Sequence, residues 1–250
     1  MSGRELGVLP ARVGAHDADE ARAVLAETGA VVLTGLPVTA DALAVAAAHL
    51  YGGRLRQLFP IRERASRDGG PVHLHADSFD QVVDIGGVPS RRRDPDEDAV
   101  LVQCARPAPT GGDSFVLDAY RYVDTCPDRE LVDFLTGVDV DLYGEWAGLR
   151  GLPATPRVGR HVEHTRTGRR IVRRTDGAVP LHRDPAAEHV TAMLDRFQRA
   201  VHALEPDLPR VRLEEGEILA VDNYRCWHGR DPHTGDRAVR ILTLRTDAAR

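Results

Sequence analysis

The chain has 250 residues, of which 42% are hydrophobic and 28% are charged, and its formal net charge is −5 with a pI near 6.1. This composition is typical of a folded globular protein and excludes an intrinsically disordered chain. The acidic balance lacks the basic character of nucleic-acid-binding domains, and no apolar stretch approaches the ~20 residues that a membrane-spanning helix needs.

Cysteine usage indicates a reducing compartment. The three cysteines, Cys104, Cys126 and Cys226, show no paired spacing, and their odd number argues against a disulfide framework. We therefore expect free thiols and a cytoplasmic protein, since disulfides belong to oxidising compartments. The N-terminus shows no signal-peptide pattern. The expected partner is a small-molecule substrate, without nucleic acid or membrane, and a homo-oligomer remains open.

The N-terminal part, about residues 1–53, is predicted to be mainly helical, in the order helix, strand, helix. Apolar residues at helical spacing and turn residues at the ends define these elements. They are a helix over 17–28, a buried strand over 30–33, and a helix over 40–51 with Thr39 as its N-cap.

The middle of the chain reads as loops, short strands and one helix. Residues 54–71 are rich in Arg, Gly and Pro and are predicted to be a loop. Residues 89–98 are a strongly charged connector, either a solvated loop or a mobile cover over a site. The regular elements expected here are strands over 99–104, 115–117 and 138–142 and a helix over 128–135.

An arginine-rich stretch, residues 157–174, contains a predicted hairpin made of 160–165 and 170–174. It is either a solvated hairpin or one wall of a substrate pocket. A helical insertion follows at about 185–205, with apolar residues at helical spacing that pack on the sheet or on a partner. These residues are Val190, Met193, Leu194, Phe197 and Val201.

The C-terminal part returns to strands, over 211–213, 217–221 and 238–244. Short strands therefore dominate, with helices at the start and one inserted near the end. This order predicts a single domain, 1–250, that is mainly β with flanking helices and a barrel or sandwich core. The sequence contains no glycine-rich dinucleotide-binding loop, no phosphate-binding loop and no nucleophile elbow of a hydrolase, which argues against those enzyme classes.

Two residues near the middle of the chain have the chemistry of metal ligands. His75 and Asp77 are two apart, so in an extended strand their side chains point to the same face. Together they make two-thirds of a 2-His-1-carboxylate triad, which binds Fe(II) and leaves positions open for oxygen chemistry. His228, which follows a strand and the turn-prone Asp222-Asn223 pair, is a candidate third ligand.

Four motifs in this order resemble the TauD/TfdA group of Fe(II)- and 2-oxoglutarate-dependent dioxygenases, and the similarity spans nearly the whole chain. They are His75-x-Asp77, Pro107-x-Pro-x-Gly-Gly-Asp-Ser114, Asp222-Asn-x-Arg-x-x-His-Gly-Arg230 and Asp236-Arg237 before the last strand. The resemblance implies a double-stranded β-helix, or jelly-roll, core. It also implies that Fe(II), 2-oxoglutarate and O2 are used, with release of succinate and CO2.

Carried over residue by residue, the resemblance implies that His75, Asp77 and His228 bind iron and form the catalytic centre. It implies that Arg237 pairs with the distal carboxylate of 2-oxoglutarate, with Ser114 assisting through its hydroxyl. Since Asp77 is retained where halogenating relatives have a small residue, halogenation is not expected.

Other residues near these motifs are candidates for cosubstrate or substrate contacts. Arg240 is the alternative to Arg237, but residues three apart on a strand face opposite sides, so only one of them can point into the site. His73 and Asp80, which flank the first two ligands, are candidate substrate residues together with Arg240. His73 could equally be a polar residue at the start of a strand, and Asp80 a turn residue.

The substrate is expected to be a small polar biosynthetic molecule, such as an amino acid or a natural-product intermediate, that is hydroxylated. Two positions argue against a sulfonate: Ile241 and Pro71 stand where taurine-binding members have an Arg and an Asn. The same cofactors could also support desaturation, cyclisation or cleavage of a carbon–heteroatom bond. A non-catalytic jelly-roll binding protein is the alternative of a different class.

Overall fold

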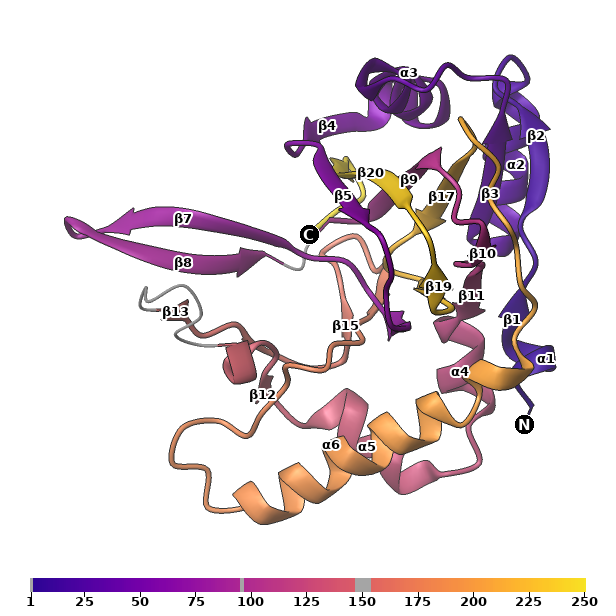
Figure 1. Cartoon of the computed structure of the whole chain (residues 1–250). Helices are drawn as coiled ribbons and strands as arrows, with labels where there is room; N and C mark the ends of the chain where they lie inside the picture. The colour runs from indigo at the N-terminus through magenta and orange to yellow at the C-terminus, as the bar shows by residue number, and fades with distance from the viewer. Residues whose placement is uncertain (1, 95–96, 147–153) are drawn as a thin grey trace.

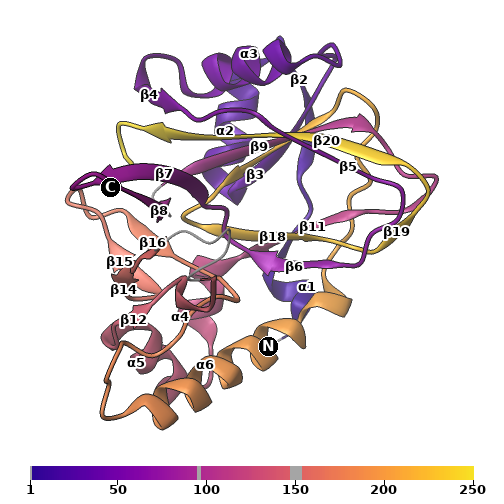
Figure 2. The same ribbon diagram turned by 60° about the vertical axis from the view of Figure 1, so that its left-hand side comes forward.

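The computed structural model describes residues 2–94, 97–146 and 154–250, without the side chains of residues 79–81, 91–94, 146 and 154. Two β-sheets face each other at its centre, and helices cover their outer faces (Figure 1, Figure 2). This arrangement confirms the predicted jelly-roll fold, mainly β with flanking helices.

The larger sheet has seven strands. Strand β20, the last strand in the chain, lies inside this sheet and is paired along both of its edges. Its continuous order is β2 (Ala11–Gly14), β3 (Ala30–Thr34), β17 (Ile218–Asp222), β9 (Ala99–Arg106) and β20 (Arg237–Thr246). The outer edge of β20 pairs with β4 (Leu55–Leu58) and with β5 (Arg62–Ser66). The prediction that residues 54–71 form a loop is therefore wrong. This charged segment contains two strands, β4 and β5, which pair with β20 at the edge of the sheet.

The smaller sheet carries most of the predicted iron ligands. Its order is β1 (Gly7–Val8), β11 (Ser114–Asp118), β18 (Cys226–Arg230) and β6 (Val72–His75). The predicted strand over 211–213 is reduced to a single bridge between Val211 and Ser114 at its margin.

Strand alternation divides the interior into three layers of apolar side chains. Along β3, Ala30 and Val32 face the space between the sheets, while Val31 and Leu33 face the helices above. Above lie α2 (Ala18–Thr28) and α3 (Ala40–Tyr51), as predicted, with Thr39 capping α3 by accepting from the Ala42 N–H. The three-residue helix η1 (Gly52–Arg54) follows α3.

The outer face of the smaller sheet is covered by α4 (Ala119–Thr125), α5 (Arg129–Gly137) and α6 (Ala187–His202). The apolar face predicted for α6 is confirmed: four of its five residues are buried, and Leu194 packs against the same cluster. They pack on their own chain, beside Trp227 of β18. Three shorter helices are α1 (Gly3–Leu6), η2 (Gly144–Trp146) and η4 (Glu205–Asp207).

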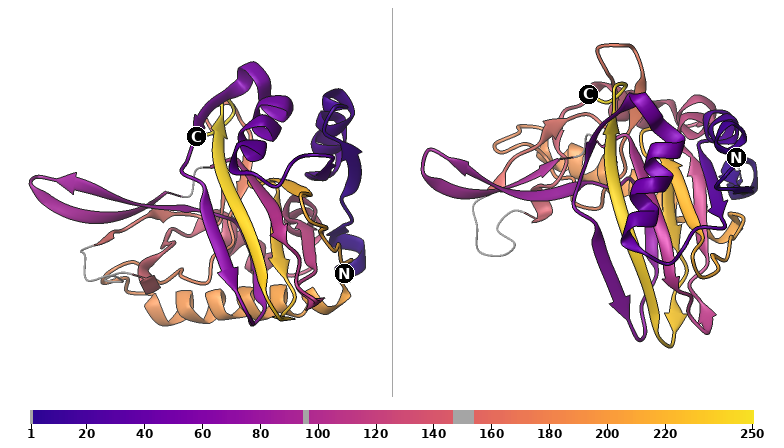
Figure 3. Two further views of the ribbon diagram at one scale, coloured as in Figure 1. Left: turned by 45° about the horizontal axis from the view of Figure 1, so that its top comes forward. Right: turned by 90° about the horizontal axis from the view of Figure 1, so that it is seen from above.

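A long hairpin projects from the body of the molecule directly after the Asp77 segment (Figure 1, Figure 3). It consists of β7 (Phe79–Ile85) and β8 (Val88–Asp94), and β13 (Ala154–Thr155) adds a short third strand. The first half of the charged connector predicted over 89–98 is therefore not a loop but part of strand β8. Residues 95–96 of that connector lie outside the described residues.

Three two-stranded pairs complete the fold. They are β10 (Thr110–Gly111) with β19 (His233–Thr234), β12 (Val140–Asp141) with β14 (Val158–Gly159), and β15 (Val162–His164) with β16 (Arg170–Val172). The last pair confirms the predicted arginine-rich hairpin. Within the described ranges, no helix is both long and apolar enough to cross a membrane.

Candidate metal centre

His75, Asp77 and His228 meet at one end of the smaller sheet. The antiparallel pairing of β6 with β18 places His75 directly opposite His228, with their ring centroids 4.5 Å apart. Strand β6 ends at His75, and Asp77 lies in the irregular segment beyond it, with its carboxylate close to both imidazoles. The three residues that the sequence singled out are thus neighbours in space.

The donor atoms of these residues converge on one point. The Nε2 atom of His75 lies 3.9 Å from Oδ1 of Asp77, and Nε2 of His228 lies 3.7 Å from Oδ2. Both distances are too long for hydrogen bonds, yet all three donor atoms lie within 4.8 Å of one another. Two imidazole nitrogens and one carboxylate in this arrangement have the chemistry of a facial Fe(II) site, so the residues present fit that metal.

Hydrogen bonds outside the cluster orient two of the ligands. Nδ1 of His75 lies 2.9 Å from the carbonyl oxygen of His73, so Nδ1 must carry the proton and Nε2 presents its lone pair to the centre. The carboxamide of Asn223 accepts from the N–H of Asp77 at 2.8 Å and donates to its carbonyl at 3.0 Å. Asn223 also donates to the carbonyl of Glu97 and is itself buried, so it fixes the backbone that carries Asp77.

The charge state of the donors also suits a metal. Burial, together with neighbouring His75, lowers the pKa of His228 to about 3, so this imidazole is neutral near pH 7. Burial alone would raise the pKa of Asp77, but His228, His75 and Arg62 outweigh it and hold that pKa below its usual value. A neutral imidazole and an ionised carboxylate are the ligand forms that bind divalent cations.

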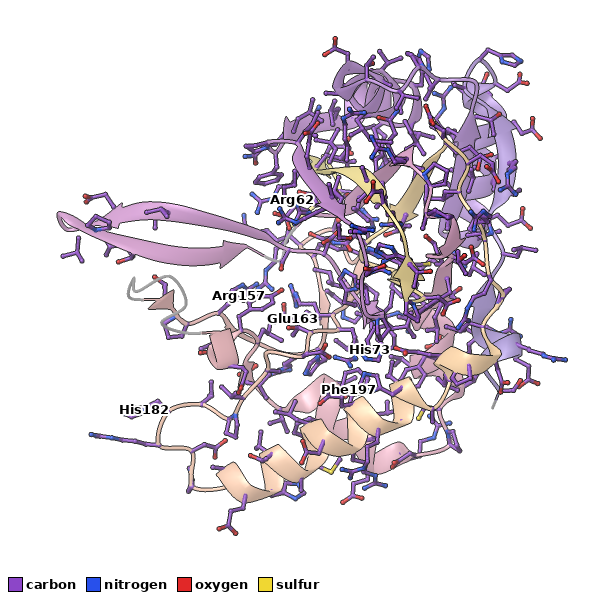
Figure 4. All side chains as sticks on the ribbon, in the orientation of Figure 1. Arg62, His73, Arg157, Glu163, His182 and Phe197 are labelled. Atoms are coloured by element: carbon purple, nitrogen blue, oxygen red, sulfur yellow. The ribbon has the colours of Figure 1, made fainter. Side chains whose placement is uncertain are left out.

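Arg62 is a neighbour of this cluster that the sequence did not reveal. It extends from β5, and its Nη2 atom lies 3.5 Å from Oδ1 of Asp77 (Figure 4). No local signal points to it, because Arg62-Glu63-Arg64 lacks the apolar–polar alternation that indicates a half-buried strand. Only the pairing of β5 with β20 places it beside the centre.

Arg237 stands at the start of β20, on the sheet opposite the histidines, and is partly buried. Within the described part of the chain its guanidinium makes no hydrogen bond and no ion pair. Burial lowers its pKa, and nearby Arg230 lowers it further. Ser114 lies opposite Arg230 in the pairing of β11 with β18. Arg237 thus has a second cation nearby and no carboxylate partner among the described residues, and this environment favours an anionic ligand.

Backbone space beside Arg237 is tight. A side chain at Gly112 would place its Cβ 3.3 Å from Nε of Arg237, and Gly112 has a φ of 79°. The glycine pair of the predicted Pro-x-Gly-Gly-Asp-Ser motif therefore provides both a left-handed turn and room for the guanidinium.

The remaining candidates lie elsewhere or are already paired. Arg240 faces away from Arg237 along β20 and binds Glu63 at 2.9 Å and Gln103 at 3.2 Å. His73 hydrogen-bonds Glu205 at 2.8 Å through Nδ1 and stacks on His202, towards α6 (Figure 4).

Donor atoms of His73, His202 and Glu205 lie within 4.8 Å of one another as a second group, apart from the first. Asp80 lies in β7, opposite Arg93 of β8 in the strand register, and only its backbone is described.

The arginine-rich hairpin is less exposed than a solvated hairpin would be. Arg173 and Arg174 are buried at 2% and 1% exposure, paired with Glu163 and Asp176. Arg169 bridges Asp98 and Asp222 at 2.6 Å and 2.7 Å. The prediction of a solvated hairpin is therefore wrong. Arg173 and Arg174 are buried in ion pairs within or next to the hairpin, and Arg169 holds the hairpin to the body of the protein.

Comparison with known proteins decides the family. The family described as "Taurine catabolism dioxygenase TauD, TfdA family" matches residues 3–245. The chain belongs to this family. As a TauD/TfdA family member it is an Fe(II)- and 2-oxoglutarate-dependent dioxygenase that acts on a small molecule. A search of curated proteins gives no match.

Solved structures show the same TauD/TfdA-type fold at low sequence identity. A putative alpha-ketoglutarate-dependent taurine dioxygenase from Burkholderia xenovorans is 16% identical with a TM-score of 0.63, covering 98% of this chain and 90% of its own. AAD-2, in complex with Mn(II) and N-oxalylglycine, is 14% identical with a TM-score of 0.61 and the same two coverages. PvcB, an Fe, alpha-ketoglutarate dependent oxygenase from an isonitrile synthetic pathway, is 16% identical with a TM-score of 0.59, covering 97% and 86%.

Proposed function

We propose that this dioxygenase hydroxylates a small polar biosynthetic substrate at a centre formed by His75, Asp77 and His228. The observation that carries the proposal is the convergence of these three donors opposite an arginine, Arg237, that has no anionic partner among the described residues. A metal site and a cosubstrate anion site thus face each other across the space between the two sheets.

In this proposal His75, Asp77 and His228 hold the iron, and Arg237 binds the distal carboxylate of 2-oxoglutarate. Arg230 adds positive charge nearby, and Ser114, opposite it, offers a hydroxyl. Iron with 2-oxoglutarate and O2 supplies the oxidant that removes hydrogen from the substrate, while 2-oxoglutarate is converted to succinate and CO2.

The protein's own residues fix the geometry of this chemistry. Asn223 holds the backbone of Asp77, and the His73 carbonyl fixes the proton on Nδ1 of His75, so the ligands need little rearrangement when metal binds. Apolar side chains between the sheets, such as Val116 opposite His228, keep water from the inner side of the centre.

The test is performed under anaerobic conditions with purified protein, Fe(II) and 2-oxoglutarate. We expect a weak visible charge-transfer band, and succinate formation when O2 and a panel of amino acids and pathway intermediates are added. His75→Ala should abolish both signals, while His164→Ala, an exposed histidine on β15, should keep them. Failure of the wild-type protein to form the band would contradict the proposed centre.

Product analysis separates hydroxylation from the other outcomes of the same chemistry. A product that has gained one oxygen atom supports hydroxylation, whereas loss of two hydrogen atoms indicates desaturation or cyclisation. We also propose a cytoplasmic location, supported by three cysteines that are all free and buried.

A further inference from the structure

Arg62 faces the interior of the jelly roll at the iron centre. Strand β5 pairs antiparallel with the edge of β20, with Arg62 opposite Ile241. Directly paired residues point to the same face, and Ile241 packs against the apolar cluster between the sheets. The side chain of Arg62 is 22% exposed, and its guanidinium reaches the carboxylate of Asp77.

The hydrogen-bonding capacity of this guanidinium is largely unused. Its described ion pair is with Asp77, at the long distance of 3.5 Å, and its Nε atom is buried with no partner among the described residues. Arg240 on the opposite face, by contrast, has two side-chain partners. A buried donor without a partner is costly, so a ligand that accepts from Arg62 would be stabilised.

The charge balance of the loaded centre points to an anionic ligand. The two positive charges of Fe(II) cancel the two negative charges of 2-oxoglutarate. Arg62 and Arg237 then contribute two positive charges, and Asp77 contributes one negative charge. One positive charge remains, and nearby Arg230 adds to it. A single carboxylate on the substrate would neutralise the remainder in a partly buried site, where unpaired charge is expensive.

We propose that Arg62 binds a carboxylate of the substrate and so selects carboxylic acids over neutral molecules. The planar fork of a guanidinium matches the two oxygens of a carboxylate and fixes its orientation as well as its position. Because Arg62 adjoins Asp77, this contact would hold the substrate's neighbouring carbon atoms next to the iron. The inference rests on the proposed function, because it places the substrate beside that centre.

The experiment uses the anaerobic protein loaded with Fe(II) and saturating 2-oxoglutarate. Matched probes, propionate against propionamide and phenylacetate against phenylacetamide, are titrated at constant ionic strength. The visible band and the thermal midpoint are the readouts. We expect the acids, but not the amides, to shift both signals saturably. Arg62→Gln should weaken acid binding by roughly tenfold or more, as expected for loss of charge-assisted hydrogen bonds.

Two further variants control for charge and folding. Arg56→Gln removes the same charge from the exposed strand β4, which also pairs with β20, and should behave as wild type. Arg62→Lys keeps the charge without the fork and should give intermediate affinity for the acids. If Arg62→Gln does not fold, the Lys variant and the wild-type comparison of acids with amides still decide the outcome.

Several results would overturn the inference: equal effects of acids and amides, no effect of any acid, or unchanged acid binding in Arg62→Gln. Weaker Fe(II) binding in that variant, with the acid effect intact, would assign Arg62 to bracing Asp77 instead. Weaker 2-oxoglutarate binding would assign it to the cosubstrate. Failure of the proposed function is distinguishable, since the band would then be absent before any probe is added.

Discussion

Arg237 and Arg240 lie three residues apart on one strand, yet their surroundings are opposite. Arg237 faces the space between the sheets without a described partner, whereas Arg240 faces outward and is held by Glu63 and Gln103. Strand alternation alone predicted that only one of them could enter the site. Which of them serves 2-oxoglutarate can therefore be tested with a matched pair of variants.

Arg237→Gln should weaken 2-oxoglutarate binding by roughly 10- to 100-fold, because a charge-assisted pair contributes about 1.5–3 kcal/mol. Arg240→Gln should leave the affinity close to that of wild type. Titration of the visible band with 2-oxoglutarate at fixed Fe(II) gives both values. The reverse pattern would move the cosubstrate to Arg240.

His161 gives the protein a pH-dependent stability that is separate from the centre. It is 1% exposed, its Nδ1 atom lies 3.1 Å from the carbonyl of Arg173, and its ring packs edge-on against Phe197. Burial, with a smaller contribution from nearby Arg174 and Arg173, lowers its pKa to about 4. Since the unfolded chain takes up a proton near pH 6.5, the unfolded state gains stability as the pH falls from about 6.5 to about 4.

At pH 5 this linkage should cost on the order of 2 kcal/mol of unfolding free energy relative to pH 7. His161→Phe, which keeps an aromatic ring but has no proton to bind, should lower that loss by about the same amount. Urea unfolding of both proteins at pH 7 and pH 5 measures the difference. Equal losses in the two proteins would show that His161 does not titrate in this range.

The predicted iron ligands could be recognised from sequence because their spacing is local or belongs to a motif. His75 and Asp77 were found from their two-residue spacing, although strand β6 ends at His75 and the expected strand does not include Asp77; His228 and Arg237 needed the resemblance. Arg62 could not be found in this way. Its position depends on which strand pairs with the edge of β20, and that pairing is set by distant parts of the chain rather than by local pattern.

Among the elements, helices with a clear apolar face were predicted closely. Helix α3 begins and ends where the sequence indicated, and α6 differs by about two residues at each end. The charged strands β5 and β8 were missed because they lie at a sheet edge or outside the body, where exposed residues need no apolar alternation. Local propensity carries little information about strands that are stabilised by their partners.

The β7–β8 hairpin carries apolar side chains in solvent: Val82, Ile85 and Val88 are each at least half exposed. Replacing residues 83–90 with Asn-Gly would join the Val82–Arg91 pair through a turn that suits a two-residue hairpin. Because little buried apolar area is lost, unfolding free energy should change by no more than about 0.5 kcal/mol.

Metal binding by the shortened protein should also remain, since the hairpin begins beyond Asp77. If the hairpin covers the substrate, substrate-stimulated turnover will fall while the Fe(II) and 2-oxoglutarate band persists. Chemical denaturation and the visible band are measured on the same preparation. A large loss of stability would show that the hairpin supports the core.

At the scale of the whole molecule, the centre joins the two sheets. His75 and His228 belong to the smaller sheet, whereas Arg62 and Arg237 belong to the larger one. The apolar layer between the sheets therefore sets the distance between the proposed metal and cosubstrate sites. That the chain acts as one domain stays a prediction, and this shared centre supports it.

Ligands that bind only the folded protein should stabilise it by mass action. Mn(II) at one hundred times its dissociation constant should raise the unfolding free energy by about 2.7 kcal/mol. Excess EDTA should reverse the gain, and His228→Ala should show none. Thermal unfolding with and without metal provides the measurement, and an equal gain in the variant would place the bound metal elsewhere.

The three buried cysteines make the protein convenient for site-specific spectroscopy. Burial raises the pKa of Cys104 to about 11 and also raises the pKa of Cys226, so these two thiols are poor nucleophiles, and all three cysteines are buried. A single Ile85→Cys substitution at the exposed hairpin tip would then accept a spin label or fluorophore selectively, with every native cysteine left in place. The label would report whether the hairpin moves during turnover in an otherwise unaltered enzyme.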